Sequence, residues 1–360
     1  MIQEGAGADQ GAIAPGAPLW QDWRRPAAPG FEMSPVPLTR RHALILAAAA
    51  GFAGALPARA QDADFLTWLA AFKQEALQQG ISAKTLDAAF AGVAPLQRVL
   101  ELDRKQPETT ITFETYIDRV VTTKRVEAGR AHLAENRALL DAISAKYNVQ
   151  PRFIVALWAV ETGFGAIQGD FNVVASLATL AYDGRRGALF RKELIAALKI
   201  LDQGRFKPEE LKGSWAGAMG QTQFMPSTFL SYAVDYSGTG RQDIWTDRAD
   251  ALASIANYLK ALGWNGAVTW GRPAKLPKHF DMDLLGGQTL KPLSAWAALG
   301  VRASDGSALP KTEIEAGLVQ PGGATGPTLL TYGNFRAIMK WNRSTYFATA
   351  ISYLADRFES

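Results

Sequence analysis

One carboxylate stands in a setting suited to acid–base chemistry. Residues 153–160 are apolar almost all round, which predicts a buried helix, and Glu161 follows at its C-terminal end before Gly163 and Gly165. Loss of water and the negative end of the helix dipole both favour a protonated carboxyl, so we expect a raised pKa for Glu161. Such an acid can protonate a glycosidic leaving oxygen. The alternative interpretation is a solvated glutamate at a helix end.

A second segment, residues 214–227, combines small, polar and aromatic side chains. Its glycines allow the backbone to approach a ligand closely. Ser214 and Gln223 can hydrogen-bond hydroxyls or amides, while Trp215 and Phe224 offer faces for sugar rings. Taken alone, the segment also fits a tight helix–loop packing motif.

The surrounding pattern predicts a mainly α protein with a minor β part. Between residues 266 and 326, glycine, proline and aspartate are frequent, and residues 268–270 indicate a short strand. Apolar residues at helical spacing, with their caps and breakers, predict helices elsewhere. The expected helices cover residues 62–79, 82–90, 112–125, 131–147, 151–162, 189–204, 248–262 and 334–358.

The composition excludes several classes of site. The 360 residues include 38 Lys and Arg, 34 Asp and Glu, three His and no Cys. Without cysteine there is no disulfide, thiolate-bound metal, thiol catalysis or lipidated cysteine anchor. A net charge of +4 is too small to indicate a nucleic-acid partner.

The first sixty residues predict export. Residues 1–38 are rich in Gly, Pro and Ala; Arg40-Arg41 and the apolar run 43–56 follow, and Ala58-Arg59-Ala60 ends the segment. This is the layout of a cleaved signal peptide, with either a twin-arginine or an ordinary secretory route. Met33 is an alternative start. We therefore expect a soluble, monomeric periplasmic protein without a lipid anchor.

Several motifs in order resemble one family, the membrane-bound lytic transglycosylase B family (glycoside hydrolase family 103). Residues 161–165 (ETGFG) and 217–227 (GAMGQTQFMPS) carry the resemblance. Further matches are residues 106–108, 113–116, 176–182, 185–186, 256–259 and 341–347. The chain departs from the family at Gly163-Phe164, where Arg-Trp is frequent, and at Trp341 and Phe347, where Tyr is common.

The resemblance implies a lysozyme-like helical core, and cleavage of the β-1,4 bond from N-acetylmuramic acid to N-acetylglucosamine in peptidoglycan. The family does this without water and leaves a 1,6-anhydromuramoyl end. Glu161 would be the single acid and base, because the C6 hydroxyl of the sugar serves as nucleophile. A helper carboxylate such as Asp170 or Asp183 stays open. The rival functions are a muramidase-type hydrolase and a catalytically weak peptidoglycan-binding protein.

The resemblance also implies the residues that bind substrate. Ser214 would contact the catalytic carboxyl and Gln223 would lie near the scissile bond. Arg185 and Arg186 would face substrate carboxylates, or else form a solvated surface pair. The aromatic and amide positions expected at the sugar are Tyr116, Phe224, Tyr258, Trp341, Asn342 and Tyr346.

Residues 235–246 resemble the start of an EF-hand loop, and some family members bind calcium there. The candidate ligands are Asp235, Ser237, Thr239, Arg241 and Asp250. Thr239 stands where an acidic residue is expected, and Asp250 comes one residue later than the expected carboxylate. We therefore expect that the protein requires no cofactor and that calcium does not bind tightly. The alternative is a loop closed by its own side-chain hydrogen bonds.

The expected organisation has five parts. They are an extension with a signal peptide (1–60), a helical N-terminal lobe (61–148), a catalytic core (149–265), a β-containing module (266–330) and a C-terminal helical segment that completes the cleft (331–360). The expected partner is the peptidoglycan strand, alongside other cell-wall enzymes, with no nucleic acid.

Overall fold

A computed structural model describes residues 58–105 and 111–359, and the side chains from residue 63 onward. The predicted signal peptide and the 106–108 motif therefore lie outside the described residues, apart from the helical backbone at 58–60. The described chain is mostly helical, as predicted, with two small antiparallel sheets. Within it, no helix has the length and apolar character needed to cross a bilayer.

Fourteen α-helices occur in the described ranges. They are α1 (Ala58–Gln78), α2 (Ala83–Ala89), α3 (Gln97–Arg104), α4 (Phe113–Val120), α5 (Thr123–Glu135), α6 (Arg137–Tyr147), α7 (Pro151–Thr162), α8 (Val173–Asp183), α9 (Gly187–Asp202), α10 (Pro226–Tyr232), α11 (Arg248–Ala261), α12 (Leu293–Ala298), α13 (Gly333–Trp341) and α14 (Thr345–Glu359). Two 3-10 turns are η2 (Met282–Leu284) and η3 (Gly323–Thr325).

The strands form one ribbon and one five-stranded sheet. The ribbon pairs β1 with β2, and Phe171 faces Gly213 in its register. The larger sheet has the order β4-β6-β7-β3-β5 and lies in the expected β module. The strands are β1 (Phe171–Asn172), β2 (Lys212–Gly213), β3 (Gly271–Lys275), β4 (Lys291–Pro292), β5 (Arg302–Ala303), β6 (Glu315–Val319) and β7 (Leu329–Thr331).

Several predicted helices are interrupted in the structure. The stretch 112–125 breaks because the Thr122 side chain accepts the N–H of Arg125 and starts α5. The stretch 334–358 breaks at Asn342, whose extended backbone ends α13. The strand expected at 268–270 is also wrong, since β3 begins at Gly271.

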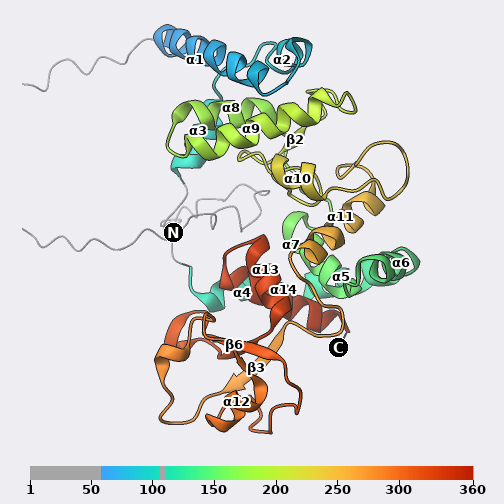
Figure 1. The fold of residues 1–360 in the computed structure, drawn as a ribbon, viewed down its shortest axis with the longest axis vertical. Helices are drawn as coiled ribbons and strands as arrows, with labels where there is room; N and C mark the ends of the chain where they lie inside the picture. Colours follow the sequence, from blue (N-terminus) through green and yellow to red (C-terminus); the bar gives the residue numbers. More distant parts are fainter. Residues whose placement is uncertain (1–57, 106–110, 360) are drawn as a thin grey trace, which may run out of the picture.

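Two helical cores meet around the candidate site. One core joins α1, α2, α8 and α9, which lie together at the top of Figure 1. The other surrounds α7 with α5, α11 and α14, and the β module lies beyond it. The segment predicted as one lobe, 61–148, contributes to both cores. Met225 and Trp341 pack against both cores and mark their junction.

Close backbone contact shapes the segment after β2. A Cβ added to Gly213 would lie 2.1 Å from the carbonyl oxygen of Ala218, and one added to Gly169 would lie 2.2 Å from the carbonyl oxygen of Gly213. Only glycine permits these approaches. The glycines therefore hold the loop after α7 against the segment that begins at Ser214.

Candidate active site

Glu161 occupies the last turn of α7, a helix that the sequence specifies at both ends. Pro151 begins it, where a missing N–H costs nothing. Gly163 ends it in the left-handed conformation, with φ of 58°. Every residue of α7 from Phe153 onward is buried, and Glu161 itself is only 1% exposed. The predicted buried helix with a carboxylate at its end is confirmed.

The indole of Trp341 donates a hydrogen bond to this carboxylate. Its Nε1 lies 2.6 Å from Oε1 of Glu161. Trp341 is the last residue of α13, and its ring packs at 5.0 Å from Tyr258 and at 5.4 Å from Phe224 between ring centroids. Tyr258 in turn stacks on Tyr232 at 4.5 Å. The donor is thus held by an aromatic cluster from three parts of the chain.

Tyr116 lies near enough to Glu161 to feel its charge. It is fully buried in α4. Burial raises the pKa of the Tyr116 phenol, the negative charge of Glu161 raises it further, and Arg125 partly opposes the rise. Burial and the nearby carboxylate thus both favour the neutral phenol. Its ring lies 5.8 Å from that of Tyr346, so both predicted tyrosines share this wall.

The segment 214–227, which bonds to α7 through Gln221, is held in an unusual conformation. Gln223 has a φ of 51°, a left-handed value that is uncommon outside glycine. Its Nε2 donates to the carbonyl oxygens of Gln168 (3.0 Å) and Gly220 (2.9 Å). The Ser214 hydroxyl accepts the N–H of Ala218 at 3.1 Å. The predicted contact of Ser214 with the Glu161 carboxyl stays a prediction.

Two buried amides offer hydrogen-bonding capacity that the described protein does not use. The side-chain oxygen and nitrogen of Asn342 have no partner among residues 58–105 and 111–359, and neither has Oε1 of Gln223. Both residues are at most 5% exposed. Leaving such groups without a partner costs about 1–3 kcal/mol each, which a polar ligand can recover.

Gln221 is a positioning residue that the sequence analysis did not single out. Its Oε1 accepts the indole N–H of Trp158 at 2.9 Å, and its Nε2 donates to the carbonyl oxygen of Trp245 at 3.1 Å. Its own carbonyl oxygen accepts the hydroxyl of Thr162 at 3.0 Å. Gln221 thereby ties α7 to the loop at 241–246. Its place inside the 217–227 motif was the available signal.

Arg185 and Arg186 converge on one buried carboxylate, that of Asp103. Nε of Arg185 donates to Asp103 Oδ2 at 2.8 Å, and Arg186 pairs with Oδ1. Asp103 is 2% exposed. Both guanidiniums are thus engaged within the protein, and the pair carries one net positive charge with Asp103. Their predicted contact with substrate carboxylates stays a prediction.

The candidate calcium loop satisfies its own oxygen atoms. Oδ1 and Oδ2 of Asp235 accept the N–H groups of Thr239 and Gly240 at 2.9 and 2.7 Å. The Thr239 hydroxyl donates to the carbonyl oxygen of Arg241 at 3.3 Å. These are the oxygens that a cation would need, and calcium requires six to eight of them.

Asp250 also stabilises the loop at 235–246 by accepting hydrogen bonds from its backbone. It is fully buried and accepts the N–H groups of Tyr236, Ser237 and Asp243. Burial raises its pKa, partly offset by these N–H groups. No cluster of three acidic or histidine side chains suited to a metal occurs in the described ranges. The loop closed by its own hydrogen bonds is the interpretation that the contacts favour.

The geometry thus gathers only part of the predicted set. Glu161, Trp341 and Tyr116 lie together, Phe224 and Tyr258 pack on Trp341, and Tyr346 packs on Tyr116. Arg185 and Arg186 are instead bound to Asp103, which sequence patterns gave no reason to select.

Comparison with known proteins identifies a family and a relative that this chain resembles. The family profile described as "Transglycosylase SLT domain" matches residues 64–356. The membrane-bound lytic murein transglycosylase B of Escherichia coli is 32% identical over 296 residues, covering 78% of this chain and 79% of that protein.

Two solved structures of lytic transglycosylases are also similar to this chain. SltB3 of Pseudomonas aeruginosa, in complex with NAG-anhNAM-pentapeptide, is 46% identical and superposes with a TM-score of 0.80, covering 82% of this chain and 80% of its own. The Escherichia coli lytic transglycosylase Slt35, in complex with calcium, is 29% identical with a TM-score of 0.68, covering 83% of this chain and 94% of its own.

Proposed function

This chain belongs to the transglycosylase SLT domain family of peptidoglycan lytic transglycosylases, and we propose that Glu161 is the single acid and base of its reaction. The bond cleaved is the β-1,4 link from N-acetylmuramic acid to N-acetylglucosamine. The product carries a 1,6-anhydromuramoyl end. SltB3 was crystallised with such an anhydro-sugar fragment, which supports this product class.

The proposed reaction has two steps. Glu161 first gives its proton to the glycosidic oxygen while the bond to the anomeric carbon breaks. The resulting carboxylate then removes the proton of the C6 hydroxyl, and that oxygen bonds to the anomeric carbon. No water is consumed, and Glu161 ends protonated. The nucleophile belongs to the sugar itself, which makes the attack intramolecular.

The observation that carries the proposal is the buried Glu161 bound by the indole N–H of Trp341. The two carboxylates considered as helpers have other surroundings. Asp183 pairs with Arg104 at 3.0 Å, and Asp170 is exposed beside a separate pocket. A single carboxylate is consistent with an intramolecular nucleophile, since a hydrolase of the usual kind needs two.

The surroundings of Glu161 suit a sugar chain. Half-buried Trp341 and Tyr258 offer aromatic surface. The unused amide of Asn342 and the unused Oε1 of Gln223 can hydrogen-bond hydroxyl or acetamido groups. We assign the predicted sugar-contacting residues on this basis. The site acts on peptidoglycan in the periplasm, after export by the signal peptide predicted before Gln61.

A glutamine substitution tests the assignment. Glu161→Gln keeps the shape and the acceptor for Trp341 but removes the proton. We expect kcat to fall about 100- to 10,000-fold, with binding to purified sacculi retained. Glu127→Gln, an exposed change in α5, is the control and should keep full activity. Full activity of Glu161→Gln would refute the assignment.

A further inference from the structure

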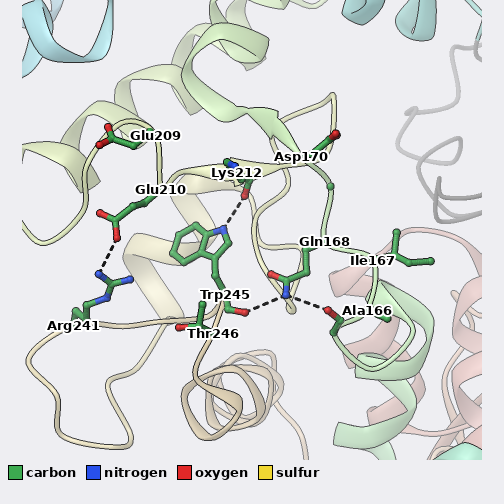
Figure 2. A pocket seen from close by; sticks show the side chains of 12 residues that line it. Ala166, Ile167, Gln168, Asp170, Glu209, Glu210, Lys212, Arg241, Trp245 and Thr246 are labelled. Carbon is green, nitrogen blue, oxygen red and sulfur yellow. Dashed lines mark hydrogen bonds and ion pairs between the residues drawn. The ribbon is translucent and has the colours of Figure 1, made fainter.

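The segment 214–227 is held at two places. In its middle, Nε2 of Gln221 donates to the carbonyl oxygen of Trp245 at 3.1 Å. Figure 2 shows that Nε2 of Gln168 donates to the same carbonyl oxygen, at 3.0 Å. These hydrogen bonds join neutral groups. The end of the segment, where α10 begins, is held instead by a carboxylate.

That carboxylate belongs to Glu193 of α9, which is only 5% exposed. Both of its oxygens accept hydrogen bonds from Ser227: Oε2 accepts the backbone N–H at 2.9 Å, and Oε1 accepts the hydroxyl at 2.8 Å. Within the part of the chain that the structure describes, Glu193 forms no ion pair. Ser227 therefore supplies the hydrogen bonds that a buried carboxylate requires.

Glu193 caps α10 from a different helix. The N-cap residue of α10 is Met225, whose side chain makes no capping bond, and Pro226 follows at the first helical position without an N–H. Ser227 is thus the first residue of α10 that has a backbone N–H, and no carbonyl within the helix can accept it. Helix α10 packs against α9 and α11 and lies between them in Figure 1. The bonds to Glu193 therefore fix the start of α10 on α9.

Both ends of α10 support the aromatic cluster that holds Trp341. Phe224, two residues before the helix, packs at 5.4 Å from Trp341 and at 5.5 Å from Tyr258 between ring centroids. Tyr232, the last residue of α10, stacks on Tyr258 at 4.5 Å. Tyr258 in turn packs at 5.0 Å from Trp341. A shift of α10 would therefore move both rings that support Trp341.

We propose that Glu193 is a positioning residue for the reaction, which acts through Ser227 and α10 to hold the indole of Trp341 against Glu161. The inference rests on the proposed function, because it needs Glu161 as the acid and base. The carboxylate of Glu193 itself transfers no proton. Proton transfer depends steeply on the placement of the reacting groups, so a displaced Trp341 lowers kcat more than it changes KM. The alternative is a cap that stabilises α10 and nothing else.

Glu193→Gln tests this role in the full chain. It keeps the size of the side chain but replaces one acceptor oxygen with an amide nitrogen that only donates. Asp202→Asn is the matched control. Asp202 is also on α9 and also accepts both the N–H and the hydroxyl of a serine, but that serine is Ser82, the N-cap residue of α2. Both variants are assayed on purified sacculi well below their Tm.

We expect Glu193→Gln to lower kcat about 3- to 30-fold with KM changed less than about twofold, and Asp202→Asn to leave both unchanged. In a Trp341→Phe background, Glu193→Gln should lower kcat less than about twofold further, because the bond that it positions is already absent. An equal loss of kcat with and without the Trp341 indole would show an independent, structural role and overturn the proposal. Unchanged kcat in the single variant would also overturn it.

Ser227→Ala gives a second test that does not depend on the folding of Glu193→Gln. It removes the hydroxyl bond and keeps the backbone N–H bond. We expect a smaller fall in kcat, about 2- to 5-fold, which again disappears in the Trp341→Phe background. A fall of the same size in both backgrounds would contradict the proposal. Failure of the proposed function would look different, since the wild type itself would then release reducing ends in place of anhydro ends.

Discussion

The indole nitrogen of Trp341 lies 2.6 Å from a carboxylate oxygen of Glu161, a residue 180 positions earlier in the chain. The bond crosses the junction between the two helical cores, since Trp341 packs against both. A tryptophan N–H can only donate, so it fixes this oxygen as an acceptor. In the proposed reaction, the other oxygen is then the one that carries the proton.

Trp341→Phe tests this relationship. The change keeps an aromatic ring beside Tyr258 and Phe224 but removes the donor. We expect kcat to fall about 10- to 100-fold, the cost of losing a hydrogen bond to a charged group, with a smaller change in KM.

Trp264→Phe is the matched control for Trp341→Phe. It also loses an indole bond, the 2.8 Å bond to Gln150, but it does not contact Glu161. Equal kcat losses in both variants would show that the Trp341 bond matters only for folding.

Calcium should have no effect on stability. Asp235 and Asp250 already accept backbone N–H groups throughout the loop at 235–246. We expect the same Tm in chelator and in about 1 mM calcium, because a bound ion would raise it by mass action. A calcium-dependent rise in Tm would show that the loop rearranges to bind the ion. Magnesium at the same concentration controls for ionic strength.

Gly213→Ala should destabilise the segment behind the site. The new Cβ would lie 2.1 Å from the carbonyl oxygen of Ala218, so backbone must move. Such overpacking costs about 1–3 kcal/mol, or roughly 3–10 °C in Tm. Gly333→Ala is the control, since its Cβ would contact only Arg336 at 3.8 Å. Thermal unfolding of both variants measures this loss of stability, and equal Tm values for the two variants would contradict the prediction.

Asp202 should make stability depend on acid pH. Hydrogen bonds from the Ser82 and Thr85 hydroxyls lower its pKa below the ordinary 3.8. A carboxylate with a lowered folded pKa stabilises the protein above pH 3.8, and this contribution is lost as pH falls through the lowered value. Asp202→Asn should therefore cost about 1–3 °C in Tm at neutral pH, since the group is exposed.

The Asp202→Asn cost should vanish in acid. Asp87→Asn, which removes an exposed ion pair with Lys73, is the control. A Tm difference for Asp202→Asn that persists unchanged at the lowest pH would contradict the role of the carboxylate.

Local features of the sequence predicted α7 and its carboxylate well. Pro151 and Gly163 fix the ends of that helix, and an apolar surface all round requires burial. Breaks at Thr122 and Asn342 were missed because capping and tertiary packing outweigh the continuing helical pattern there. The Trp341–Glu161 bond and the Asp103 partner of Arg185 depend on long-range contacts, which periodicity cannot reveal.

The central claim is that Glu161 transfers both protons and that no water enters the product. Mass spectrometry of the muropeptides released from purified sacculi tests it most directly. We predict muramoyl ends lighter by one water than hydrolysed ends, formed by the wild type and absent with Glu161→Gln. Reducing-end muramoyl sugars from the wild type would contradict the account and assign the site to hydrolysis.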